Sequence, residues 1–499
     1  MRVAMDWKKF VMGLGLLLVL GLLGCAEQPP ATPAPTTPAA TTPPVTTPPV
    51  TTPPVTTPPA TTPTTPVTTP KTTPPVSAEP IRVCALFDPR LPVFKGNIEA
   101  IRAAVEAINA QGGIMGRKVE FYHEDTQRKV DIAIAAYRKS VIETGCKVVF
   151  VEGVSEEVMA ILEEGAKIYP SKPHITMASQ AGVETTFKVI ENYDKYKFYF
   201  RNLPPDPDLN YNVAKWFFDI AKNTVKAKRV ALLLEDAAWT KCAREGCRFE
   251  SKFGVFESKP MKDWVKEEFG MDVVYVAHIA VGEKNFLPML EAIAARNADF
   301  IFVLSSWYTD TTTLTKQWAS SSAKNIQIAF FGGPAQWMAA WNLTGGASLG
   351  TIVMVYDYEG MPEVSPTTLP VVKALHAKGL SLDTSAHYYY SEMIRIKEAM
   401  EKVGNPDDID AVIKVMEEMW FENHTSIPVP WQHFGYKNAN FHSYTGGPTL
   451  NAQIQCNGIP VYINRPEVMA EHQWPESVVK AMNPAAYKPP AELRKICGK

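Results

Sequence analysis

Residues 109–125 read NAQGGIMGRKVEFYHED and place three glycines within five positions. Apolar residues recur at helical spacing over residues 97–110, before the glycines, and a strand pattern, KVEFYHE, follows them at 118–124. A phosphate-binding glycine loop has the opposite order, because it follows a strand and opens a helix. These glycines therefore predict a helix C-cap and a turn into a strand, and not a phosphate site.

The same alternation of strand and helix patterns extends from Ile81 through most of the chain. The first set of expected strands covers 81–87, 118–124, 147–153 and 174–179, with helices over 97–110, 128–143 and 156–168. The second set has strands over 229–236, 271–279, 298–306 and 326–333, with helices near 257–269, 285–296 and 310–320. A further strand is expected after about residue 350, then helices near 365–378, 384–403 and 408–419, and a loop-rich tail with few helices. Two successive sets predict an α/β protein with two doubly wound parallel-sheet lobes, whose ligand lies outside the carboxyl ends of the strands.

The segment AVEAINAQGGIMGRKVEFYHED (104–125) resembles periplasmic substrate-binding proteins of ABC importers, in the branched-chain amino acid and amide group. Other segments agree in order and spacing: HITMASQAG, FRNLPPD (200–206), GEKNFLPMLEAIAARNADFIFV (282–303) and IAFFGG (328–333). The resemblance covers about residues 80–420. It implies the type I fold, in which three strands cross between two lobes that close on a small ligand by a hinge. We expect the crossings near 203, 355 and 422, the first lobe over 80–203 and 356–421, and the second over 204–355 and 422–499.

The resemblance also implies a set of ligand-binding residues. The family holds a ligand carboxylate at the start of the helix after the third strand, which here places Ser155 at the site, with Glu156 and Glu157 beside it. Its next contacts correspond to Ala178 and Gln180, with Ser179 between them. The family's aromatic positions correspond to Phe94, Trp239 and Trp307. For each tryptophan, packing in a core is an equal alternative, and for Ser155 the alternative is a helix cap alone.

One departure from the family bears on the ligand. Members that bind amino acids place an acidic residue after the strand that ends in GG, where it holds the ligand ammonium. Here the segment is FFGGPAQWM, with Pro334 and Gln336. An ammonium left unpaired in a closed site costs several kcal/mol, on the order of a broken buried ion pair. We therefore expect a ligand other than a plain α-amino acid, such as an amide, an aromatic or aliphatic carboxylate, or another uncharged metabolite.

The amino-terminal 80 residues predict export and anchoring. Basic residues and the apolar run VMGLGLLLVLGLLG are typical of a signal peptide over residues 1–24. The run ends in LLGC, which resembles a lipobox and implies that Cys25 carries a lipid; an ordinary signal or a short anchor is the alternative. The Thr/Pro-rich tract over 25–80 predicts a disordered linker between the lipid and the lobes. We expect a protein on the outer face of the cell membrane or in the periplasm.

The remaining six cysteines form an even set in an exported protein, where disulfides persist. They are Cys84, Cys146, Cys242, Cys247, Cys456 and Cys497. Cys242 and Cys247 are near enough to close a small loop, adjacent parallel strands could bring Cys84 to Cys146, and Cys456 with Cys497 is left by elimination. The spacing alone leaves the connectivity open. A metal site is disfavoured, because no CxxC pair or His cluster accompanies these cysteines.

The formal net charge of −2 gives no electrostatic reason to expect nucleic acid as a partner. The expected partners are a small-molecule ligand and the permease and ATPase subunits of an ABC importer, bound by a monomer without a cofactor. The alternatives are a sensor that presents a solute to a membrane receptor, an extracytoplasmic α/β enzyme and a purely structural surface lipoprotein. The sequence has no GxSxG, HExxH or Walker motif, which disfavours the enzyme.

Overall fold

The computed structural model describes residues 79–90, 92–152, 155–179, 182, 184–202, 209–251, 254–306, 308–333, 335, 339–354, 363, 368–380, 384–419, 449–472 and 474–499. The predicted signal peptide, Cys25 and the linker up to residue 78 lie outside these ranges. So do Gln180, Trp307 and Gln336, and the expected strand crossings near residues 203, 355 and 422.

The first lobe is built on a parallel sheet with the strand order β2-β1-β3-β4-β5. Its strands are β1 (Ile81–Leu86), β2 (Val119–Glu124), β3 (Val148–Val151), β4 (Ile175–Ala178) and β5 (Tyr199–Arg201). Every residue of the central strands β3 and β4 is buried, as expected for parallel strands that are covered on both faces. The continuous apolar runs that predicted these strands therefore reflect their central position.

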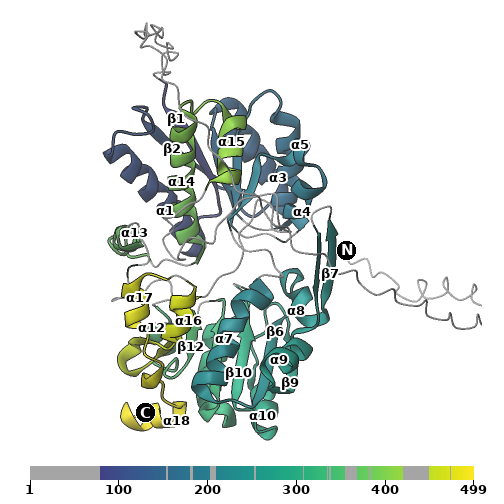
Figure 1. Cartoon of the computed structure of the whole chain (residues 1–499), viewed down its shortest axis with the longest axis vertical. Coiled ribbons are helices and arrows are strands. Elements are labelled where there is room, and N and C mark those ends of the chain that lie inside the picture. The colour runs from purple at the N-terminus through teal and green to yellow at the C-terminus, as the bar shows by residue number, and fades with distance from the viewer. Residues whose placement is uncertain are drawn as a thin grey trace, which may run out of the picture. The chain divides into compact units, whose positions relative to one another are not determined.

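Helices from two distant parts of the chain cover this sheet (Figure 1). The first group is α1 (Pro92–Ala110), α2 (Val130–Arg138) with a π-helical turn at Lys139–Glu143, α3 (Ser155–Ile168), α4 (Glu184–Glu191) and α5 (Tyr193–Tyr196). The second group is α13 (Thr368–His376), α14 (Thr384–Val403) and α15 (Ile409–Glu418). Helix α14 packs along α1 and against α15, and residues of both groups share one hydrophobic core.

The second lobe contains a larger sheet with the strand order β14-β13-β12-β11-β10-β6-β9. Its strands are β6 (Arg229–Glu235), β9 (Asp272–Ile279), β10 (Phe300–Leu304), β11 (Gln327–Phe331), β12 (Ile352–Met354), β13 (Asn451–Ile454) and β14 (Pro460–Tyr462). Neighbouring strands are parallel except in the pairs β12–β13 and β13–β14, which are antiparallel. Alternate residues of the central strands enter two separate cores, because successive side chains point to opposite faces.

The helices of this lobe, several of them short, lie between and after these strands. They are α7 (Ala214–Ile220), α8 (Lys241–Glu245), α9 (Met261–Phe269), α10 (Leu287–Ala295), α11 (Thr311–Ser320), α12 (Ala340–Thr344), α16 (Pro466–Glu471), α17 (Glu476–Ala481) and α18 (Pro490–Ile496). A hairpin of β7 (Cys247–Ser251) and β8 (Gly254–Ser258) forms a separate two-stranded sheet. No helix in the described ranges is long and apolar enough to cross a bilayer.

The structure confirms the turn between α1 and β2. Gly113 has a φ of +81°, and a Cβ at this position would lie 2.0 Å from the carbonyl oxygen of Arg117, so only glycine fits. The Asn109 side chain joins the helix to the strand, because its amide donates to the Val119 carbonyl and its oxygen accepts the Val119 N–H, both at 2.8 Å. The segment is therefore structural.

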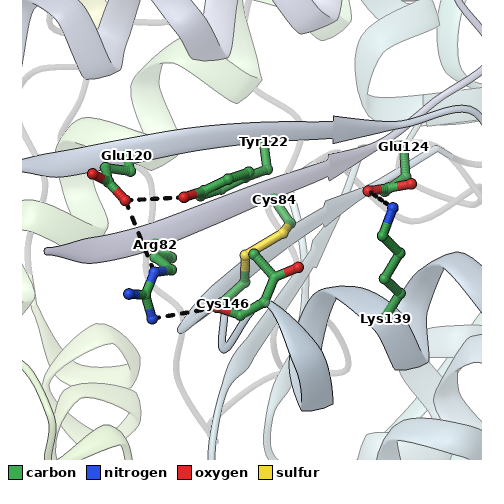
Figure 2. Close-up of a disulfide and its surroundings, with 8 residues drawn as sticks. Arg82, Cys84, Glu120, Tyr122, Glu124, Lys139 and Cys146 are labelled. Carbon is green, nitrogen blue, oxygen red and sulfur yellow. Dashed lines mark hydrogen bonds and ion pairs between the residues drawn. A yellow bond between two sulfur atoms is a disulfide. The ribbon is translucent and has the colours of Figure 1, made fainter.

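Three disulfides join the six cysteines: Cys84–Cys146, Cys242–Cys247 and Cys456–Cys497. In the first, Cys84 of β1 meets Cys146, which precedes the neighbouring strand β3, as expected for adjacent parallel strands (Figure 2). An ion pair of 2.8 Å between Lys139 and Glu124 flanks this bond. The second closes a short loop before β7, and the third joins the β13–β14 segment to the end of the chain.

The predicted elements of the two sets are present with shifted ends. Helix α1 begins at Pro92 rather than at residue 97, and α9 begins at Met261 because residues 254–258 form β8 instead. The expectation of a loop-rich tail with few helices was wrong for residues 449–499. These residues form two strands of the main sheet and three short helices, whose lengths are too small to give a clear periodicity.

Candidate functional site

Ser155 lies at the carboxyl edge of the first lobe's sheet, as the first residue of α3 directly after β3. Its Oγ accepts the backbone N–H of Gly182 at 2.8 Å, which joins the loop after β3 to the loop after β4. A hydroxyl that accepts one bond retains its own hydrogen for donation. Together with the amides of the first turn of a 14-residue helix, this arrangement suits a carboxylate or amide oxygen.

Tyr389 of α14 joins the carboxyl ends of β3 and β4 by hydrogen bonds. Its hydroxyl accepts the N–H of Ser179 at 2.9 Å and donates to the carbonyl of Val151 at 2.7 Å. Its ring meets Phe87 and Phe150 edge to face, with centroids 5.2 and 5.7 Å apart. The brace fixes the backbone beside Ser179, whose buried Oγ has no hydrogen-bond partner within the described structure.

Carboxyl groups shape the electrostatics of this edge. Asp88, which is 4% exposed, accepts two bonds from the Arg90 guanidinium at 2.6 and 2.8 Å, and these hold the pKa of its carboxyl below the usual value. Burial raises the pKa of Glu157 to about 7, although Arg128 acts in the opposite direction. At pH 7 Glu157 is therefore protonated in about half of the molecules, which reduces its repulsion of an anionic group at the start of α3.

Glu235 is the centre of the corresponding edge in the second lobe. It ends β6, is 0% exposed and accepts four hydrogen bonds from two different loops. Oε1 accepts the Ser306 N–H at 3.1 Å and the Thr309 hydroxyl at 2.6 Å. Oε2 accepts the Ser306 hydroxyl at 2.6 Å and the Trp239 indole N–H at 2.8 Å. A carboxylate has about four acceptor positions, so these donors fill it.

Trp239 is held at three points. Its indole N–H binds Glu235, its carbonyl accepts the side-chain amide of Asn210 at 2.9 Å, and its ring meets Phe331 edge to face at 6.3 Å between centroids. Phe331 ends β11, so two aromatic rings lie at the carboxyl edge of this sheet. The ring is half-buried, which leaves part of its surface open to a ligand.

The loops after β10 and β11 are locked to one another. Gly332 has a φ of +93°, and a Cβ at this position would lie 1.6 Å from the carbonyl oxygen of Ser305. Thr311 of α11 accepts the N–H of Ala335 at 2.9 Å through its hydroxyl. The loop that leads to Pro334 and Gln336 therefore begins from a fixed position.

The predicted site residues divide into three groups. Ser155, Ala178 and Ser179 lie together at the carboxyl edge of the first lobe, and Trp239 lies at the edge of the second. Phe94 is 4% exposed and belongs to the core of the first lobe. Gln180, Trp307 and Gln336 lie outside the described residues.

Sequence reasoning missed two residues of these edges, Glu235 and Tyr389. An acidic residue that ends an apolar strand, as in RVALLLED (229–236), was a usable signal for Glu235. Nothing local distinguishes Tyr389 within the run HYYYSE. Within the described ranges, no group of three or more His, Cys, Asp or Glu side chains is arranged to hold a metal ion.

A family model and individual relatives both place this chain among binding proteins. The model of a family described as periplasmic binding protein matches residues 89–445. The Leu/Ile/Val/Thr-binding protein of Salmonella typhimurium is 22% identical over 318 residues, which cover 63% of this chain and 76% of the relative.

Solved structures agree on the fold. A branched-chain amino acid transporter substrate-binding protein from Streptococcus pneumoniae, in complex with isoleucine, has a TM-score of 0.56 at 16% identity and covers 76% of this chain and 97% of its own. A solute-binding protein from R. palustris, in complex with 4-hydroxybenzoate, has a TM-score of 0.56 at 14% identity, with coverages of 77% and 95%.

Proposed function

Because the chain belongs to the periplasmic binding protein family, we propose that it captures a small molecule between its two lobes outside the cytoplasm and delivers it to an ABC permease with its ATPase subunits. The observation that carries this proposal is the construction of the two carboxyl edges. One offers Ser155 at a helix start, and the other offers the fixed ring of Trp239. A polar anchor with an aromatic wall is typical of a small-molecule site.

The ligand is a carboxylate or amide without an α-ammonium group. Support comes from three carboxylates among the described residues at the edge of the second lobe, because each of these three is already engaged. Glu235 holds four donors, Asp236 pairs with Arg244 at 2.9 Å, and Asp310 pairs with Lys284 at 2.8 Å and caps α11. The similar structures contain one ligand of each kind: isoleucine has an α-ammonium group, and 4-hydroxybenzoate is a carboxylate without one.

Two measurements test the ligand class. Native mass spectrometry of the purified full-length protein names a co-purified ligand directly. Isothermal titration calorimetry then compares leucine, isoleucine and valine with 4-hydroxybenzoate and related acids and amides. Micromolar binding of any of the three amino acids contradicts the class, and no binding or thermal stabilisation by any compound contradicts solute capture itself.

The proposed function also includes a division of the chain into two lobes. We assign 80–203 and 356–421 to the first lobe, and 204–355 and 422–499 to the second. The packing of α13, α14 and α15 with α1 supports the first assignment, and the pairing of β13 with β12 supports the second. The protein acts as a monomer, which light scattering of the full-length chain tests.

The lipid anchor is part of the proposed function and rests on the sequence. Lipid on Cys25 would hold the protein at the membrane, and the Thr/Pro-rich tract would give the lobes reach towards the permease. Replacing Cys25 by serine is expected to move the protein from the membrane fraction to the soluble extracytoplasmic fraction. An unchanged membrane fraction, or a native protein without the lipid mass, contradicts the anchor.

A further inference from the structure

We propose that Glu235 is a positioning residue that sets the ligand-facing surface of the second lobe. Its carboxylate binds the Trp239 indole, Ser306 and Thr309, so that this lobe presents the surface of an aromatic ring to the ligand. This inference rests on the proposed function and narrows it, because it assigns the second lobe to a planar or apolar part of the ligand.

The topology brings the two loops to the same carboxylate. Strands β6 and β10 are parallel neighbours, with Leu234 opposite Leu304. The residues that follow these positions, Glu235 and Ser305, therefore emerge side by side at the carboxyl edge. Glu235 can reach donors from its own loop, at Trp239, and from the loop after β10, at Ser306.

The hydrogen bond to Glu235 determines which part of the Trp239 side chain remains available for contact with a ligand. The indole has a single polar group, its N–H, and Glu235 accepts it at 2.8 Å. Turning the indole away would leave a fully buried carboxylate oxygen short of a donor, which is unfavourable. The indole is therefore restrained with its N–H directed inward, and the exposed part of the ring is apolar.

The same bonds exclude Glu235 as an anchor for a ligand ammonium. Its acceptor positions are occupied by Trp239, Ser306 and Thr309. A ligand cation would have to displace one of these donors and leave that donor buried without a partner. A planar aromatic or apolar group packed on the ring needs no such exchange.

Two residues of the loop after β10 are bound by the same carboxylate. Ser306 gives both its N–H and its hydroxyl to Glu235, and Thr309 gives its hydroxyl. One buried carboxylate thus orders two loops that are about 70 residues apart in sequence, with separations of 71 and 74 residues.

The experiment compares the full-length protein with Glu235→Gln by hydrogen–deuterium exchange and mass spectrometry. The glutamine keeps the size of the side chain but replaces one acceptor oxygen by a donor, so bonds on that side are lost. The matched control is Glu283→Gln, a glutamate of the same lobe that accepts the N–H groups of Lys284 and Asn285 in an exposed loop.

We expect the amides of 236–240 and 305–310 to exchange at least about tenfold faster in Glu235→Gln, as for the loss of a hydrogen bond to a charged group. Strands β6 and β10, the first lobe and the control variant should keep wild-type exchange rates. Unchanged exchange in either loop overturns the proposal. Uniformly faster exchange across the second lobe also overturns it, because it indicates a general stability role.

Two further readouts separate positioning from folding. The indole ¹⁵N–¹H resonance of Trp239, assigned with Trp239→Phe, should shift in Glu235→Gln. With 4-hydroxybenzoate as the calorimetric probe, Glu235→Gln should weaken binding about tenfold or more, but less than about twofold in the Trp239→Phe background. Equal weakening in both backgrounds overturns the role through Trp239. If the wild type binds neither 4-hydroxybenzoate nor any related acid or amide, the proposed ligand class fails, and the exchange and resonance data still decide the positioning role.

Discussion

We predict that the burial of His174 makes the folded protein less stable on mild acidification. It is completely buried just before β4, and its Nδ1 lies 2.7 Å from the carbonyl oxygen of Lys172. A carbonyl can only accept, so Nδ1 carries the hydrogen and Nε2 accepts from the Tyr137 hydroxyl, 2.5 Å away. Tyr137 in turn accepts from the Thr176 hydroxyl at 2.6 Å. In this arrangement the imidazole is neutral, with one ring nitrogen donating and the other accepting.

The magnitude follows from the pKa. Burial lowers the pKa of His174 from 6.5 to about 4, because the charged imidazolium loses its hydration. The unfolded chain therefore binds more protons between these values, and the stability contributed by the neutral ring is complete above pH 6.5 and is lost as the pH falls towards 4. A tenfold change in proton affinity is about 1.4 kcal/mol, so the free energy of unfolding should fall by roughly 2 kcal/mol between pH 8 and pH 5 from this group alone.

Urea unfolding at pH 8 and pH 5, monitored by circular dichroism, tests this for the wild type and His174→Gln. The glutamine does not titrate, so the wild type should lose about 2 kcal/mol more than the variant over this pH range. Other titrating groups contribute equally to both proteins and cancel in the difference. A control variant of the exposed His278 to glutamine should behave like the wild type. Equal losses in wild type and His174→Gln would refute the reasoning.

Three other predictions concern the site and its scaffold. Ser155→Ala should weaken ligand binding about tenfold by calorimetry, whereas Met115→Leu should leave it unchanged; equal effects would contradict the site at α3. Ligand binding through an anionic group should weaken above pH 7, where Glu157 ionises, and Glu157→Gln should remove this dependence; an identical pH profile in the variant would contradict the effect. Replacing Cys84 and Cys146 by alanine opens a loop with a sequence separation of 62 and should lower the free energy of unfolding by about 4 kcal/mol in urea titrations, and a loss below about 1 kcal/mol would contradict this estimate.

The sequence predicted those features that depend on neighbouring residues. The turn at Gly113 and the buried strands were predicted because backbone conformation and apolar periodicity are local. The brace by Tyr389 was not predictable in this way, since it binds Ser179 from 210 residues further along the chain. The donors of Glu235 come from loops that become neighbours only when β6 lies beside β10. Family resemblance proposed Ser155 and Trp239 as site residues, but the bonds that hold them could be seen only in the three-dimensional arrangement.

The Cys84–Cys146 disulfide reaches the amino end of β3 and Ser155 lies beyond its carboxyl end, because Cys146 precedes this strand and Ser155 follows it. The covalent crosslink and the proposed ligand site thus lie at opposite ends of β3. Substitutions that retune the recognised solute can accumulate at one end while the crosslink maintains the scaffold at the other. Such a separation would let related binding proteins diversify in what they collect without a matching loss of durability.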